Sequence, residues 1–237
     1  MTASAKPKSK SAKKSSSSTG LWLVGGAVLL LALVVIILVL NQQQSAPSSI
    51  AAPDVPAEWI NGTSIGNPEA TVVVQAWEDF LCPACQQWTR EVKDTLFEQY
   101  VNTGKVRYEF HQFPLSQHYP GALQASMASM CAADLNEFWP YHDRVFQAAT
   151  SRGQAGTEVE ALIGYARELG IDENAMRSCM NNLTHQATVL ASLDQARQLG
   201  LSSTPSILVD GQLISNPFNF NALAAQIDSA IAAKATN

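Results

Sequence analysis

The stretch from Val72 to Cys85 limits the possible folds of this chain more than any other part of it. An apolar, β-branched run leads through Trp77 to the pair Cys82 and Cys85, and a segment with helix-like spacing of apolar residues follows. This order predicts a strand, a turn and a helix that begins at the first cysteine. The dipole and the free backbone N–H groups of a helix start favour a thiolate, which is the nucleophile of thiol–disulfide exchange.

The Cys-x-x-Cys motif has two interpretations. Half of a structural zinc site would need a second Cys or His pair at ligand spacing. The other cysteines, Cys131 and Cys179, are isolated, and His111 and His118 are seven residues apart, which is longer than usual. A redox site would need a cis-proline loop that faces the cysteines, and Thr204-Pro205 is a candidate for it. Because two distant signals agree, we favour the redox site, with an ordinary trans turn at the proline as the alternative.

The N-terminal part of the chain predicts a membrane anchor. Five lysines and no acidic residue lie in the first 14 residues, and the range 1–20 has no apolar pattern, so we expect a disordered basic tail. The range 21–40 has no charge and no proline, and a helix of that length matches a hydrocarbon core of about 30 Å. A cleaved signal peptide is the alternative, but the run is long and ends without an Ala-x-Ala pattern. The lysines predict a single-pass protein of the cell membrane with a cytoplasmic N-terminus and an extracytoplasmic domain, where disulfides persist.

Composition limits the kind of protein that the residues after the predicted anchor can form. The range 41–57 is rich in Gln, Ser, Ala and Pro, which predicts a flexible linker. Beyond the five tail lysines, 10 Lys and Arg stand against 20 Asp and Glu. This acidity argues against nucleic-acid binding, which needs a basic surface. We therefore expect one acidic domain over residues 58–237, a monomer that binds no nucleic acid, metal or cofactor.

The apolar spacing over residues 58–237 predicts the order β-α-β, a block of helices, then β-β-α. Strands are expected at 71–77, 105–113, 206–209 and 212–214, with a turn at 66–69 and a hairpin turn at Asp210-Gly211. Helices are expected at 83–101, 121–135, 137–149, 158–169, 172–180, 183–199 and 219–233. This order predicts an α/β protein with a thioredoxin fold and an all-helical insertion at about 115–200.

Four stretches resemble the DsbA-like thiol–disulfide oxidoreductases, in particular their membrane-anchored, BdbD-like branch, over roughly residues 60–235. In chain order they are Ile65–Pro68 with Asp79–Cys85, Gly104–Leu115 with His118, Cys131-Ala132 with Phe138–Asp143, and Leu199–Ile207 with Asp210-Gly211. The resemblance implies a thioredoxin fold that passes a disulfide to unfolded secreted or envelope proteins. It also implies re-oxidation by a membrane quinone-linked oxidase of the DsbB or VKOR kind.

The expected roles of the site residues follow from the helix start. Cys82 is expected to be the low-pKa sulfur that attacks and leaves, and Cys85, one turn further on, the resolving thiol. Pro83 suits the first helical turn, where its missing N–H costs nothing. A cis bond to Pro205 is expected to set the Thr204 backbone against the two sulfurs.

Two positions depart from the family. Where many relatives carry a histidine that helps the thiolate, this chain has Ala84, and where they carry a glutamate six residues before the first cysteine, it has Ala76. Glu78 lies two residues further on and therefore on the same face of a strand. We hypothesise that Glu78 assists proton transfer to the buried thiol. The alternative is a solvated carboxylate near the end of the strand.

The remaining cysteines, Cys131 and Cys179, are 48 residues apart in the helical block and predict a structural disulfide. Closing a loop of that length stabilises a fold by about 4 kcal/mol in the chain-entropy model. A second redox pair that tunes the first, and two buried free thiols, are the alternatives. His142 is expected to pack or cap within the block, and His185 to lie on a helix surface.

The sequence thus predicts a membrane-tethered, extracytoplasmic thiol–disulfide oxidoreductase that introduces disulfides into other proteins. Within the enzymes, the alternative is a reductase or an isomerase. Isomerases of this fold usually bring a dimerisation domain, for which the short linker leaves no room. In another class, the alternative is a metallochaperone that binds copper or zinc through Cys82 and Cys85.

Overall fold

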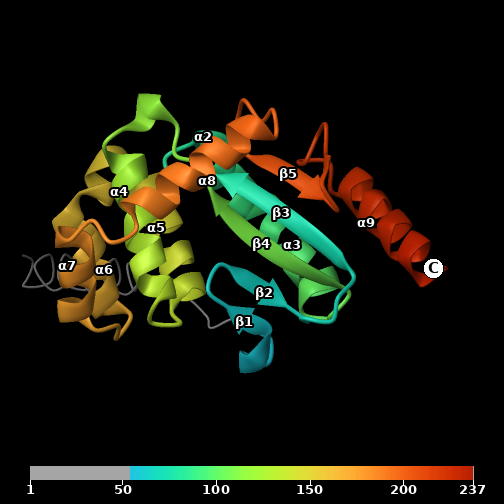
Figure 1. The fold of residues 1–237 in the computed structure, drawn as a ribbon, viewed down its shortest axis with the longest axis horizontal. Helices are drawn as coiled ribbons and strands as arrows, with labels where there is room; N and C mark the ends of the chain where they lie inside the picture. Colours follow the sequence, from blue (N-terminus) through green and yellow to red (C-terminus); the bar gives the residue numbers. More distant parts are fainter. Residues whose placement is uncertain (1–53, 237) are drawn as a thin grey trace, which may run out of the picture. The chain divides into compact units, whose positions relative to one another are not determined.

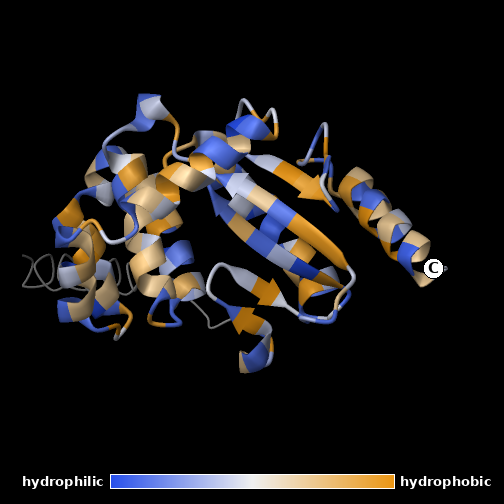
Figure 2. Cartoon of the chain, viewed as in Figure 1, coloured by the Kyte–Doolittle hydropathy of each residue, from blue (hydrophilic) through white to orange (hydrophobic). Residues whose placement is uncertain are grey.

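The computed structural model describes residues 54–236, which form the fold in Figure 1. The predicted tail (1–20), the predicted anchor (21–40) and the predicted linker up to residue 53 lie outside the described residues. From residue 54 to residue 236, no helix is both long enough and apolar enough to span a membrane. Figure 2 shows hydrophobic and hydrophilic residues interleaved along the elements of this part of the chain.

The centre of the fold is a six-stranded sheet with the order β1-β2-β4-β3-β5-β6. The strands are β1 (Ile60–Asn61), β2 (Ser64–Gly66), β3 (Val72–Glu78), β4 (Val106–Gln112), β5 (Ser206–Val209) and β6 (Gln212–Leu213). β3 and β4 are parallel, whereas every other pair is antiparallel. In the register of β3 and β5, Trp77 lies opposite Ser206. The loop before β5 is therefore beside the end of β3, where the cysteine motif begins.

The chain is helical without a break from Pro83 to Val101, as the sequence predicts. It comprises α2 (Pro83–Trp88), η2 (Thr89–Lys93), α3 (Asp94–Leu96) and η3 (Phe97–Val101), of which η2 and η3 are π-helical. The side chains of Trp88, Val92 and Leu96 follow helical spacing and are all buried in the main core. This helix returns the chain to β4 and completes the β-α-β unit that carries the site.

The helical insertion lies between β4 and β5. It contains α4 (Gly121–Ala133), α5 (Phe138–Arg152), α6 (Val159–Glu168), α7 (Glu173–Asn181) and α8 (Gln186–Gln198), with 3-10 turns η4 (Ser116–His118) and η5 (Gly153–Thr157). In Figure 1, α4 to α7 gather beyond one end of the sheet, and α8 runs back toward it and contacts β4. The last helix, α9 (Phe220–Ala235), packs against β3 and β5. The predicted thioredoxin arrangement with an all-helical insertion is confirmed.

Two features differ from the sequence-based expectations. The short strands β1 and β2 were not predicted, because they have only two and three residues. β2 pairs with distant residues of β4, such as Ser64 with Glu109, and β1 pairs with β2. They follow a short 3-10 turn, η1 (Ala57–Trp59). The prediction of His185 on a helix surface is wrong, since this residue precedes α8 and its side chain is only 13% exposed.

Candidate active site

The two motif cysteines lie at the start of α2. Cys82 is the residue that precedes the first helical turn, and Pro83 occupies that turn, where no N–H is needed. Cys82 is 7% exposed, whereas Cys85 is fully buried. The backbone N–H of Asp79 donates to Cys85 Sγ at 3.4 Å, and the N–H of Cys82 donates to the Asp79 carbonyl oxygen at 3.0 Å. The turn before the helix therefore fixes both sulfurs and leaves only the first at the surface.

The two sulfurs differ strongly in acidity. A hydrogen bond from the Cys85 thiol, assisted by the backbone N–H groups of Ala84 and Cys85, lowers the pKa of Cys82 to about 5. Burial and the same hydrogen bond raise the pKa of Cys85 well above its ordinary value. At neutral pH the reduced pair therefore holds one thiolate, on the accessible sulfur. Ala84 contributes its backbone N–H to this state.

The loop before β5 faces the cysteines. Cys82 Sγ lies 3.4 Å from the carbonyl oxygen of Thr204, to which the protonated thiol can donate. The Thr204–Pro205 peptide bond is cis. A second cis bond, Tyr119–Pro120, was not anticipated from the sequence. The contact across 122 residues brings the two predicted halves of the site together.

Asp79 is a buried site residue that the sequence analysis did not single out. Its Oδ1 accepts from the N–H of Leu81 at 2.8 Å, and its Oδ2 accepts from the N–H of Leu115 at 2.8 Å. The same Oδ2 lies 2.7 Å from Nδ1 of His118. Asp79 thus ties the cysteine turn to the segment after β4, and a short Asx turn just before the motif is the only local signal of this role.

Glu78 lies beneath the cysteines and is fully buried, so the solvated alternative is wrong. Its Oε1 accepts from the Tyr108 hydroxyl at 3.2 Å, and that hydroxyl in turn lies 3.4 Å from Nε1 of Trp88. Among the described residues, its Oε2 has no hydrogen-bond partner. Burial raises the pKa of Glu78 to about 8, although the Tyr108 hydrogen bond and the charge of Lys93 oppose the shift. Glu78 therefore holds a proton at neutral pH in the interior that also contains Cys85.

A buried ion pair lies near Glu78 and joins the helix after the motif to the insertion. Lys93 is 5% exposed and lies 3.3 Å from Asp143 on α5 and 3.1 Å from the exposed Asp94. His142 is fully buried, and its Nδ1 lies 2.8 Å from Asp143 Oδ1. Burial lowers the pKa of His142, so its ring is neutral at pH 7. The expectation that His142 packs within the helical block is confirmed.

Of the remaining predicted residues, Cys131, Cys179 and His185 lie together in the helical insertion. Cys131 on α4 and Cys179 on α7 form a disulfide within the helical insertion. Within residues 54–236, the one group of three metal-ligating side chains comprises these two cysteines and His185, and it does not include the motif cysteines. His118 contacts Asp79 as described, whereas His111 stacks on Trp77 with ring centroids 4.2 Å apart.

The acidity of Cys82 gives a direct prediction. Alkylation of Cys82 in the reduced protein should increase with pH around a midpoint near 5 and be close to its plateau at pH 7, because the thiolate is the reactive form. Peptide mass spectrometry after timed treatment with iodoacetamide measures this rate. Cys85→Ala removes the hydrogen-bond donor and should move the midpoint upward, whereas Cys85→Ser retains a donor and should move it less. A midpoint near the ordinary thiol value of 9 in the unmodified protein would contradict the assignment.

Comparison with known proteins agrees with this geometry. A family model described as Thioredoxin matches residues 59–229. Probable disulfide bond formation protein D of Bacillus anthracis is 29% identical over 167 residues, which are 70% of this chain and 76% of that protein. Na(+)/H(+) antiporter NhaA 3 of Salinispora tropica is 30% identical over 167 residues, but these are only 24% of the antiporter. The crystal structure of oxidised BdbD from Bacillus subtilis superimposes with a TM-score of 0.66 at 20% identity, over 72% of this chain and 93% of that one. The chain therefore belongs to the thioredoxin family, in its DsbA-like branch.

Proposed function

We propose that this protein is a thiol–disulfide oxidoreductase that works as an oxidase, transferring the Cys82–Cys85 disulfide to pairs of cysteines in unfolded secreted or envelope proteins. One observation supports this function best: the pKa of Cys82 is lowered to about 5, whereas the pKa of Cys85 is raised well above its ordinary value. A stable thiolate on Cys82 stabilises the reduced form of the enzyme. A dithiol whose reduced form is stabilised gives its disulfide away readily.

The proposed reaction proceeds in two steps. A substrate thiolate attacks Cys82 Sγ, the Cys82–Cys85 bond breaks, and Cys85 leaves with the electron pair. The second substrate thiolate then attacks the substrate sulfur that is bonded to Cys82 and releases Cys82 as a thiolate. Two electrons have moved from the substrate to the enzyme, and the substrate has gained one disulfide.

In the first step Cys85 leaves as a buried thiolate, which needs a proton. Glu78 has a pKa of about 8 and is protonated at neutral pH, whereas the pKa of Cys85 is far above its ordinary value. Proton transfer from the Glu78 carboxyl to Cys85 is therefore downhill. Tyr108 holds the carboxyl by a hydrogen bond, and Lys93 compensates the negative charge that remains. The predicted proton role of Glu78 is part of the proposal.

The role of Glu78 predicts a change in both rate and pH profile. Glu78→Gln should slow oxidation of a two-cysteine peptide by about 100-fold at pH 7, because it removes the proton donor. In the unmodified enzyme, the rate per substrate thiolate should fall as pH rises through about 8, where Glu78 loses its proton. Stopped-flow kinetics from pH 6 to pH 9 measure both effects, and the variant should lack the fall near 8.

The matched control for this experiment is Glu109→Gln. Glu109 lies on β4, is half-buried, and hydrogen-bonds to His111 and Arg107, which lower its pKa to about 2. It is ionised throughout the tested pH range, so its substitution should leave the profile unchanged. Equal profiles in Glu78→Gln and Glu109→Gln would remove Glu78 from the proton path.

The direction of exchange depends on the reduction potential, and its measurement tests the proposed function. A Cys131→Ser/Cys179→Ser variant retains one redox pair and can be equilibrated in glutathione buffers with alkylation of the free thiols. We expect a potential near the value of about −120 mV known for DsbA. A value near −270 mV, as in thioredoxin, would instead indicate a reductase. If Cys82 and Cys85 form no disulfide in these buffers, the metallochaperone alternative replaces the oxidase.

We further propose that the segment 21–40 anchors the protein in the cell membrane with residues 58–237 outside the cytoplasm. Its length, its lack of charge and the preceding lysines support this placement. A quinone-linked membrane oxidase of the DsbB or VKOR kind would then restore the Cys82–Cys85 disulfide. Labelling of the thiols in intact cells with a membrane-impermeant maleimide tests the location, since only an extracytoplasmic Cys82 would react.

A further inference from the structure

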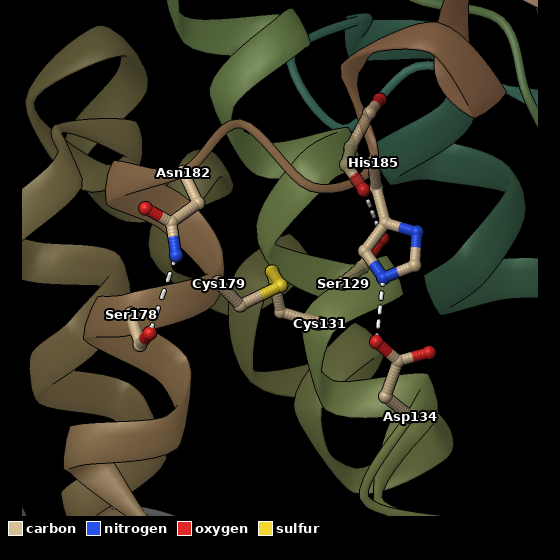
Figure 3. The surroundings of a disulfide bond; sticks show 8 residues. Ser129, Cys131, Asp134, Ser178, Cys179, Asn182 and His185 are labelled. Atoms are coloured by element: carbon tan, nitrogen blue, oxygen red, sulfur yellow. Dashed lines mark hydrogen bonds and ion pairs between the residues drawn. A yellow bond between two sulfur atoms is a disulfide. The ribbon is translucent and has the colours of Figure 1, made fainter.

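The Cys131–Cys179 disulfide has polar neighbours that a purely structural cross-link does not require. Figure 3 shows the disulfide between α4 and α7, with His185 and Asp134 beside it. One donor atom each from Cys131, Cys179 and His185 lies within 4.8 Å of the others. His185 Nε2 is also 2.7 Å from Asp134 Oδ2. Two sulfurs and an imidazole nitrogen therefore gather at one point, and the Asp134 carboxylate contacts the imidazole.

The helices hold these four side chains at fixed places. Cys131 belongs to the last turn of α4, and Asp134 follows three residues later at the end of that helix, so both lie on one side of it. Cys179 is in the last turn of α7, and His185 immediately precedes α8. The turn between them is tied by a hydrogen bond from the N–H of Thr184 to the carbonyl oxygen of Cys179.

The geometry points to a zinc site that forms when the Cys131–Cys179 disulfide is reduced. Thiolate and imidazole are ligands that zinc takes, and a water molecule beside two thiolates and one imidazole completes its tetrahedral preference, with Asp134 holding the imidazole. Zinc–sulfur bonds of about 2.3 Å place two thiolates about 3.8 Å apart, so the sulfurs need only separate by side-chain rotation. Asp134 is 56% exposed and gives the ion a path from solvent, while His185 is 13% exposed and shields the metal.

Reduction and metal binding are separate steps. A dithiol reductant transfers two electrons and two protons to the Cys131–Cys179 bond, becomes a disulfide itself, and leaves two thiols. A Zn²⁺ ion then replaces both thiol protons, which are released to solvent. The ion holds α4, α7 and the start of α8 together in place of the covalent bond, and it occupies the sulfurs that would otherwise re-oxidise. The site is independent of the Cys82–Cys85 exchange.

The test uses the full-length chain with Cys82→Ser and Cys85→Ser, so that the motif cannot bind metal. The protein is reduced with a phosphine, freed of it, and titrated with Co²⁺, which gives intense visible absorption and thiolate charge-transfer bands at tetrahedral sites. We expect one Co²⁺ per chain in the reduced protein and none in the oxidised protein. Added Zn²⁺ should displace the Co²⁺, and it should raise the melting temperature of the reduced protein.

Two variants and a control separate a built site from chance binding by thiols. His185→Ala keeps both cysteines and should fold with its disulfide intact. After reduction it should weaken Zn²⁺ binding by more than about 100-fold, since it loses a ligand and not only an outer partner. Asp134→Asn should weaken binding by about 10-fold. The control, His111→Ala, removes a half-buried histidine on β4 and should change nothing. If the reduced protein binds no Co²⁺, or if His185→Ala binds Zn²⁺ as tightly as the control, the inference is wrong.

Discussion

Replacing Cys82 with serine should abolish disulfide transfer to a peptide with two cysteines. Cys82 is the one motif sulfur with exposed surface, and its thiolate is the form that leaves when the product is released. A serine hydroxyl can form no disulfide, so neither the first attack nor the release can occur. The loss should be complete at every pH, in contrast to the pH-dependent loss expected for Glu78→Gln.

Cys85→Ser serves as the matched variant. It removes the buried sulfur but keeps the accessible one, so the enzyme should still form mixed disulfides through Cys82. The Cys82 thiolate attacks the disulfide of an oxidised client, which gives a Cys82–client mixed disulfide and one free client thiol. Because the Cys85 sulfur that would displace the client is missing, these mixed disulfides should accumulate in the cell. Non-reducing electrophoresis and mass spectrometry detect them. Residual transfer by Cys82→Ser, or mixed disulfides at Cys85 in that variant, would contradict the assigned roles.

Removing the second disulfide should lower the free energy of unfolding by about 4 kcal/mol. The Cys131–Cys179 bond closes a loop of 48 residues, and opening it increases the entropy of the unfolded chain by that order in the loop-closure model. The Cys131→Ser/Cys179→Ser variant, unfolded with urea under metal-free conditions, gives the value by comparison with the unmodified protein. We expect the folded structure to persist at a lower midpoint, since the insertion retains its buried core.

The control for this loss is Ser178→Ala, which changes the residue before Cys179 on α7. It removes a 3.4 Å hydrogen bond with Asn182 at an exposed site and should change the stability by no more than about 0.5 kcal/mol. The same double-serine variant tests the alternative of a second redox pair. A structural disulfide leaves the potential of Cys82–Cys85 unchanged, so a shifted potential in the variant would show that the second pair tunes the first.

The parts of the fold that sequence reasoning found are those with a local cause. The valine run of β3, the motif at the start of α2 and the apolar spacing of the later helices each follow from neighbouring residues. The strand β2 was missed because it pairs with β4, more than 40 residues away, and β1 was missed because it pairs, among the described strands, only with β2. A run of two or three residues is too short for an alternation of apolar and polar side chains to indicate a strand.

The same distinction applies to the site. Cys82 and Cys85 carry their own signal, but the roles of Asp79 and Tyr108 depend on contacts across 36 and 30 residues. Glu78 was recognised as a candidate by its place on the strand, whereas only the packed structure shows that it is buried and protonated at neutral pH. His185 was misplaced because its surroundings come from the end of α4, and no spacing along the chain reveals them.

The near-complete burial of the motif has a consequence for timing. Because Cys82 is only 7% exposed and contacts Thr204, an incoming sulfur must approach it past the Thr204 loop. A cysteine held inside a folded client cannot reach Cys82, whereas a cysteine on an extended segment can. For the proposed oxidase, the period in which a client can receive a disulfide is therefore set by how fast the client folds. Slow-folding clients should be oxidised at most of their cysteine pairs, and fast-folding ones only at those that emerge first.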